Sequence, residues 1–269
     1  NFLVLWEAQF ADFVNNAQVL IDTMISSEKE KFGLESNLVL LLPHGYDGMG
    51  PEHSSSRLER FLTLHTDTPE EAERTRDDLE RFRNANFTVV YPSAPSNFFH
   101  VLRRSFSWPF RRPMVVLTPK RTLRLPRAAS PFTEFLRDRG TQTAFLPVLD
   151  DPRSLDMHHV ESIAVCSGEI FYDVLKIVEN LQEKVSQTVA IVRVEQLAPF
   201  PLPQLTAIVK QYARARRAVW MQEEPRNMGA LRFTAPFLER LGVDLGAPTS
   251  RPVSAAPAQG NPRDHQASQ

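Results

Sequence analysis

Residues 43–57 concentrate the side chains best suited to chemistry. This segment contains His44, His53, three consecutive serines and an arginine, together with three glycines and two prolines. Glycine and proline at this density predict a fixed, irregular path for the backbone. Histidine changes its charge near neutral pH and can transfer a proton or bind an anionic substrate. We therefore predict a functional loop; the alternative is a structural loop whose histidines only satisfy backbone groups.

The elements around this loop alternate between strands and helices. Short apolar runs predict buried strands, and apolar residues at helical spacing predict helices between them. The expected strands are residues 2–6, 38–42, 87–91, 114–118, 162–166, 189–194 and 217–221. The expected helices are residues 15–26, 96–107 (with Ser96 as its N-cap), 169–183 and 203–212. Such alternation predicts an α/β fold with parallel sheets, in which a loop at the carboxyl end of a strand lies where ligands bind.

Composition excludes several classes of function. The 269 residues carry a formal net charge of -1, which argues against a nucleic-acid binder or a polybasic membrane-surface protein. No apolar run approaches the roughly 20 residues that span a bilayer. The single cysteine, Cys166, cannot form an intrachain disulfide, and its apolar strand predicts a buried, unreactive thiol. Residue 1 leads directly into an expected strand, so we expect a fragment of a longer protein.

Ordered motifs extend along nearly the whole chain. They are Glu-Ala-Gln-Phe-Ala-Asp-Phe at residues 7–13, Pro-Glu-His-Ser-Ser at residues 51–55, Arg-Val-Glu-Gln-Leu at residues 193–197 and Trp-Met-Gln-Glu-Glu-Pro at residues 220–225. These motifs resemble the C-terminal part of the thiamine diphosphate-dependent component of 2-oxoglutarate dehydrogenase complexes. The resemblance implies two parallel-sheet domains. A partial transketolase-like pyrimidine-binding domain would span residues 1–126, and a linker at 127–157 would lead to the C-terminal domain at 158–269.

The resemblance also implies roles for individual residues. His53 matches the active-site histidine of the family's Pro-Glu-His-Ser motif, and His44 is the second catalytic candidate. Phe13, Phe10 and Gln9 are the expected cofactor-binding residues, since an aromatic face suits the aminopyrimidine ring. For the two phenylalanines, the alternative is a pair of core residues. The cofactors would be thiamine diphosphate and Mg2+, the metal being bound mainly by a domain that this chain lacks.

The function implied is oxidative decarboxylation of 2-oxoglutarate, with transfer of the succinyl group to lipoamide in the tricarboxylic acid cycle. We expect a homodimer that docks on a lipoyl-bearing dihydrolipoamide succinyltransferase, in the mitochondrial matrix or a bacterial cytoplasm. The sequence contains no Gly-Asp-Gly motif, and the family's catalytic glutamate would precede Asn1, so we expect the chain alone to be inactive. The alternatives are a 2-oxoadipate dehydrogenase component and a truncated, non-catalytic interaction module.

Other charged segments allow two interpretations each. Basic residues crowd between Arg103 and Arg127 without an intervening acid, which indicates either an anion site or salt bridges between domains; we favour the salt bridges. Residues 67–83 are almost all charged and predict a solvated helix with pairs four residues apart, Glu70/Arg74 among them. Glu169 stands where the family has lysine, and we expect the Glu223-Glu224 pair to contact another domain or subunit.

Overall fold

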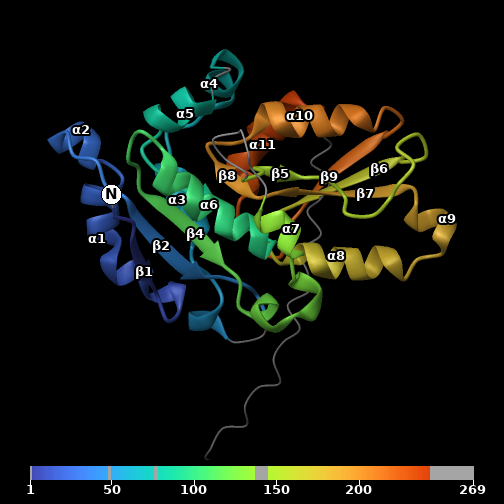
Figure 1. The fold of residues 1–269 in the computed structure, drawn as a ribbon, viewed down its shortest axis with the longest axis horizontal. Coiled ribbons are helices and arrows are strands. Elements are labelled where there is room, and N and C mark those ends of the chain that lie inside the picture. Colours follow the sequence, from blue (N-terminus) through green and yellow to red (C-terminus); the bar gives the residue numbers. More distant parts are fainter. Residues whose placement is uncertain (1, 48–49, 76–77, 137–144, 243–269) are drawn as a thin grey trace, which may run out of the picture.

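Two α/β units lie side by side in the computed structural model, which describes residues 2–47, 50–75, 78–136 and 145–242 (Figure 1). The first sheet has the strand order β1-β2-β4-β3-β8. Its strands are β1 (Val4–Glu7), β2 (Leu38–Pro43), β4 (Met114–Thr118), β3 (Thr88–Val90) and β8 (Gln196–Ala198). All neighbours pair in parallel except β3 and β8. The carboxyl ends of four strands therefore meet at one edge of this sheet.

The second sheet has the order β5-β7-β6-β9. Its strands are β5 (Val148–Leu149), β7 (Val189–Val194), β6 (Ser162–Cys166) and β9 (Arg217–Met221). Helices cover both faces of β6. Because side chains alternate along a strand, successive residues of β6 pack against opposite layers. Ile163 and Val165 belong to one apolar cluster with Leu205, whereas Ala164 and Cys166 belong to another with residues of α8. Burial on both faces explains why this strand is apolar throughout.

Helices of very different length connect the strands. They are α1 (Gln18–Leu20), α2 (Glu28–Phe32), α3 (Leu58–Leu64), α4 (Pro69–Arg74), α5 (Asp78–Asn84), α6 (Pro95–Ser107), α7 (Phe132–Phe135), α8 (Ile170–Glu179), α9 (Glu183–Ser186), α10 (Leu202–Gln211) and α11 (Leu231–Arg240). Ala11–Ala17 and Pro51–His53 form 3-10 helices, and Ile21–Ile25 forms a π-helical turn. Figure 1 shows α8 and α10 on opposite sides of the second sheet. None of the helices in the described residues is both long and apolar enough to cross a membrane.

The structure corrects two expectations. Residues 2–6 were expected to form a buried strand, but all four residues of β1 are exposed. The reason is position, because β1 lies at the sheet edge and pairs only with β2. Ser96 is not the N-cap of α6: the cap is Ala94, and Pro95 takes the first helical position, which suits its fixed φ. Ser96 lies in the first turn and donates to Glu134 at 2.6 Å.

The charged segment at residues 67–83 joins the two units and is not simply solvated. It forms α4 and α5, and Arg81 is buried against Asp67 with an N–O distance of 3.0 Å. Arg81 also donates to the carbonyl of Phe200, and the Asp67 carboxylate accepts from the Phe200 amide. The expected Glu70/Arg74 pair is wrong, since Glu70 pairs with Arg240 of α11. Within residues 127–157, expected to be a linker, β5 pairs with β7.

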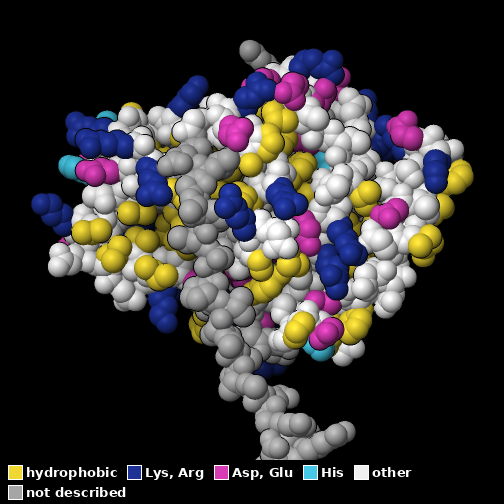
Figure 2. Space-filling model, turned by 180° about the vertical axis from the view of Figure 1, so that it is seen from behind, with side chains coloured by type: hydrophobic (Ala, Val, Ile, Leu, Met, Phe, Trp, Pro, Cys, Tyr) yellow, Lys and Arg dark blue, Asp and Glu magenta, His cyan; other side chains and the backbone are white. Residues whose placement is uncertain are grey.

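Charge is mixed over the surface. On the face shown in Figure 2, Lys and Arg side chains of the described residues alternate with Asp and Glu and form no large field of one sign. This distribution agrees with the formal net charge of -1.

Candidate active site

His44 begins the loop that follows β2, and it is fully buried. Its Nδ1 accepts a hydrogen bond from the Ser56 amide at 3.0 Å, so the neutral ring carries its proton on Nε2. That nitrogen donates to Oε1 of Glu224, also at 3.0 Å. Both ring nitrogens are therefore engaged, and His44 links the loop to the second unit.

Carboxylates from the segment after β9 hold the start of the loop. Glu223 accepts from the backbone amide of Tyr46 at 3.2 Å and from the Tyr91 hydroxyl at 3.4 Å. Both Glu223 and Glu224 are buried. Burial, and then the neighbouring charge of Glu224, raise the pKa of Glu223. The expectation that this glutamate pair makes contacts between domains is confirmed.

Gly45 is required by the close approach of Glu169, which caps α8. A Cβ built on Gly45 would lie 2.3 Å from Oε1 of Glu169, far inside van der Waals contact. Glu169 is only 2% exposed, and its Oε2 has no hydrogen-bond partner. Burial, and then the charge of Glu223, raise the pKa of Glu169 to about 7. The Glu169 carboxyl therefore gains or loses its proton near neutral pH. It does so in contact with Gly45 of the loop.

His53 lies at the far end of the loop, in the 3-10 turn, and is only half-buried. Its ring stands edge-on to Phe10, with centroids 4.1 Å apart, and to Phe13, with centroids 6.3 Å apart. Phe13 is 50% exposed, so it is not a core residue. Lys120 donates to the carbonyl of His53 and pairs with Asp47 at 3.1 Å. Within the described residues, the imidazole makes these ring contacts and no side-chain hydrogen bond, so its nitrogens can meet a ligand.

An open cleft of about 1460 Å³ lies beside this aromatic group at the carboxyl edge of the first sheet. Gln9 and Phe10 line one part, and Lys120, Arg121 and Arg124 line another. Since carboxyl edges of parallel sheets are the usual ligand positions in α/β proteins, this cleft is the candidate active site. The structure thus brings Gln9, Phe10, Phe13 and His53 together and sets His44 apart as a buried residue.

The basic cluster is largely neutralised within the chain. Arg121 forms a two-pronged pair with Asp173 at 2.9 Å, and Arg127 pairs with Glu179; both acids lie on α8 of the second unit. Arg112 pairs with Glu35 within the first unit. The preferred interpretation, salt bridges between domains, is confirmed for Arg121 and Arg127. Cys166 is fully buried, and burial raises the pKa of its thiol to about 12, as expected for an unreactive cysteine.

The residues present fit the ring portion of thiamine diphosphate better than its charged portion. Phe13 and Phe10 offer apolar rings beside the cleft, which suits a flat heterocycle. The described residues include no group of three or more His, Cys, Asp or Glu able to hold a metal ion. Two contributors, Asp47 and Glu169, are not evident from the sequence, because each acts through a contact with a distant segment.

Comparison with known proteins finds two family matches along the chain. Residues 1–126 match the pyrimidine-binding domain of transketolase, and residues 130–269 match the family described as 2-oxoglutarate dehydrogenase C-terminal. The chain is 44% identical over 264 residues to the 2-oxoadipate dehydrogenase complex component E1 of Mus musculus, covering 98% of this chain and 27% of the relative. It is 41% identical over 263 residues to the 2-oxoglutarate dehydrogenase E1 component of Cupriavidus necator, covering 97% and 25%.

A third relative, the 2-oxoglutarate dehydrogenase E1 component of Rickettsia felis, is 38% identical over 268 residues, covering 98% of this chain and 25% of that protein. The chain thus spans about a quarter of the length of the curated relatives it matches. The two domain matches and the mostly parallel α/β fold together identify the family of this protein. The chain belongs to the 2-oxoglutarate dehydrogenase E1 family of thiamine diphosphate-dependent 2-oxo acid dehydrogenases.

Proposed function

We propose that this chain supplies the histidine loop and the aromatic wall of an active site that decarboxylates 2-oxoglutarate and passes the succinyl group to lipoamide. The supporting observation is the position of His53, half-buried against Phe10, which itself lines the large cleft, and near the exposed Phe13. Family membership supplies the reaction class. Thiamine diphosphate, when bound, supplies the carbanion chemistry, and Mg2+ would assist at its diphosphate.

The residues of the chain have separate tasks in this proposal. Phe13 and Phe10 would hold the pyrimidine ring, and Gln9 would donate or accept a hydrogen bond at the cleft wall. His53 would face the 2-oxo acid, where its imidazole would serve as the proton donor or acceptor. His44, with both nitrogens engaged, is a positioning residue that fixes the loop. Of the two catalytic candidates, we therefore assign the chemistry to His53.

A second substrate, 2-oxoadipate, is favoured by one observation. The 2-oxoadipate dehydrogenase components of mouse and rat are 44% identical to this chain, against 41% and 38% for the two bacterial 2-oxoglutarate dehydrogenase components. The two acids differ by one methylene, which is worth only about 1–3 kcal/mol of discrimination in an apolar pocket. Steady-state rates of the complete protein on both acids, with its lipoyl partner, decide between them.

We further propose a homodimer and association with a lipoyl-bearing dihydrolipoamide succinyltransferase. Support for the dimer comes from the apolar surface around β1, where Val4, Leu5 and Trp6 are 45–57% exposed, together with Val19 and Leu20. A patch of this kind is typical of a protein interface. The relatives come from mammals and bacteria, so the proposed compartment is the mitochondrial matrix or a bacterial cytoplasm. Sedimentation equilibrium of the parent and of Trp6→Glu tests the dimer; a monomeric parent contradicts it.

The catalytic proposal is tested by His53→Ala in the complete protein, assayed with thiamine diphosphate, Mg2+ and the lipoyl partner. Loss of an acid or base that acts in the reaction lowers turnover by about 100-fold or more. His158→Ala is the control, because His158 is exposed and lies on a turn of the second unit. Equal turnover of the two variants on both acids would remove His53 from the site.

A further inference from the structure

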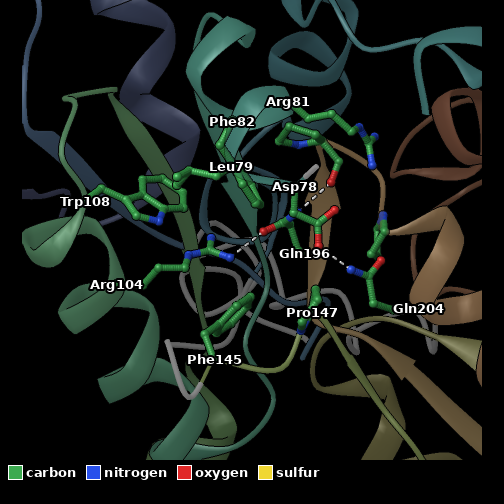
Figure 3. A pocket seen from close by; sticks show the side chains of 12 residues that line it. Asp78, Leu79, Arg81, Phe82, Arg104, Trp108, Phe145, Pro147, Gln196 and Gln204 are labelled. Carbon is green, nitrogen blue, oxygen red and sulfur yellow. Dashed lines mark hydrogen bonds between the residues drawn. The ribbon is translucent and has the colours of Figure 1, made fainter. Parts of the chain in front are cut away.

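A second cavity, of about 240 Å³, lies where α5 and α6 meet the segment around β8. None of the residues that line it lines the cleft near His53. Figure 3 shows its side chains converging from both units, with the Arg104 guanidinium between Trp108 and Phe145 and directed toward Gln196. The cavity is therefore walled by aromatic rings and contains a cation.

Arg104 has an unusual environment. Its guanidinium carbon lies 4.8, 4.7 and 4.3 Å from the ring centroids of Phe82, Trp108 and Phe145. The side chain donates from Nη1 to Oε1 of Gln196 at 2.9 Å. In the part of the chain that the structure describes, neither Nε nor Nη2 has a hydrogen-bond partner, although the residue is only 4% exposed. These two atoms form the edge with which a guanidinium binds a carboxylate through two parallel hydrogen bonds.

Among the described residues, Arg104 forms no ion pair. Burial lowers its pKa to about 9, although the charge of Asp78 acts in the opposite direction, so the guanidinium is still protonated at neutral pH. The carboxylate of Asp78 lines the same cavity but accepts a hydrogen bond from Gln204. Arg81, on the same helix as Asp78, shows the contrast, because it has its own carboxylate partner in Asp67. A buried cation without a counterion is costly, and a bound anion relieves that cost.

We propose that this cavity binds a small organic carboxylate, whose two oxygens pair with Nε and Nη2 of Arg104 while its apolar body contacts the aromatic lining. The size fits a small ligand, since the pockets of drug-sized ligands span roughly 300–1,000 Å³. A single negative charge matches the single uncompensated cation. A phosphate dianion would place a second negative charge near Asp78 with no further free cation among the described lining residues.

The probe is benzoate, measured by isothermal titration calorimetry with the complete chain and compared with benzyl alcohol, which has the ring but no charge. We expect saturable binding of benzoate and at least tenfold weaker binding of benzyl alcohol. Arg104→Met, which keeps an apolar side chain of similar length, is expected to weaken benzoate binding at least tenfold. Arg232→Met makes the same change at an exposed position of α11 and should bind benzoate as the parent does.

A cavity-filling variant covers the case in which Arg104→Met fails to fold. Leu79→Trp narrows the same cavity from α5 and leaves Arg104 in place, so it should also abolish benzoate binding. Absence of saturable binding to the parent, or equal affinity in Leu79→Trp and Arg232→Met, would overturn the proposal. Binding is measured without turnover, so the result is independent of the function proposed for His53.

Discussion

The two ends of one loop differ in almost every physical property. At its start, His44 is fully buried, both its ring nitrogens are hydrogen-bonded, and Glu223 holds the next turn of backbone. At its far end, His53 is half-buried and packs edge-on against aromatic rings, and its backbone bonds to Gly50 and Lys120. The contacts of the chain thus fix the loop at His44 and leave His53 accessible to a ligand.

We infer from this difference that the two histidines of the loop have separate tasks. A group with both nitrogens engaged in a buried network stabilises a geometry, because replacing it leaves its partners unsatisfied. A group with free hydrogen-bonding capacity beside a cleft can meet a ligand. Stability and turnover should therefore respond to different substitutions within the same loop.

The largest expected effect on stability is that of His44→Ala. It leaves the Glu224 carboxylate and the Ser56 amide buried without their partner, which costs about 3 kcal/mol of the free energy of unfolding. Urea denaturation measures this loss. His158→Ala, at an exposed position, should leave the urea midpoint unchanged. An equal midpoint for both variants would contradict an anchoring role for His44.

Gly45→Ala should also destabilise, by about 1–3 kcal/mol, because the new methyl group must displace Glu169 or the loop. The double variant Gly45→Ala with Glu169→Ala removes the obstructing carboxyl and should recover part of that loss. Thermal unfolding of the two single variants and the double variant gives the coupling between the sites. Strictly additive effects would show that this contact does not position the loop.

Glu169 makes the stability of the loop depend on pH. Its pKa is raised to about 7 in the folded chain from an ordinary value of 4.5, first by burial and then by Glu223. The folded state therefore holds the extra proton between these two values. The stabilisation is fully present below pH 4.5 and is lost as pH rises through about 7.

Glu169→Gln removes this titration. At pH 8 the variant should be more stable than the parent, by on the order of 1–3 kcal/mol, and the difference should shrink toward pH 5. Chemical denaturation at half-unit steps of pH measures both slopes. Parallel slopes for the parent and the variant would show that Glu169 is ionised throughout this range.

Phe13→Ala should have the smallest effect on folding, less than about 0.5 kcal/mol, because half of the side chain is already exposed. In the complete protein, however, the loss of the Phe13 ring should weaken the binding of thiamine diphosphate. We expect this to raise the cofactor concentration needed for half-maximal activity. Phe32→Ala, at another exposed aromatic position, is the matched control. Equal cofactor requirements would remove Phe13 from the aromatic wall.

Much of the fold follows from short apolar runs. The expected strands at residues 114–118, 162–166, 189–194 and 217–221 coincide with β4, β6, β7 and β9, because strands covered on both faces must be apolar throughout. Strands β5 and β8, of two and three residues, were missed, since segments this short carry little periodic signal. Helix α11 was also missed, and Pro236 inside it interrupts the helical pattern.

The residues of the candidate site could be named from the sequence, but the contacts that hold its loop in place could not. The motif around His53 and the aromatic residues at 10 and 13 are each short, so these candidates could be named from the sequence. The contact between the two segments, with ring centroids 4.1 and 6.3 Å apart, is a finding of the structure. The contacts of Glu169 with Gly45 and of Glu224 with His44 join residues more than 100 positions apart. Such contacts depend on how two units pack. The division at residues 126 and 158 stays a prediction.

The central claim is that His53 acts in the chemistry while His44 only fixes the loop. The direct test measures turnover on 2-oxoglutarate and the free energy of unfolding in the same preparation of the complete protein carrying His53→Ala. Turnover should fall about 100-fold or more, with the free energy of unfolding changed by less than about 1 kcal/mol. Parental turnover, or a loss of turnover matched by a loss of folded protein, would contradict the account.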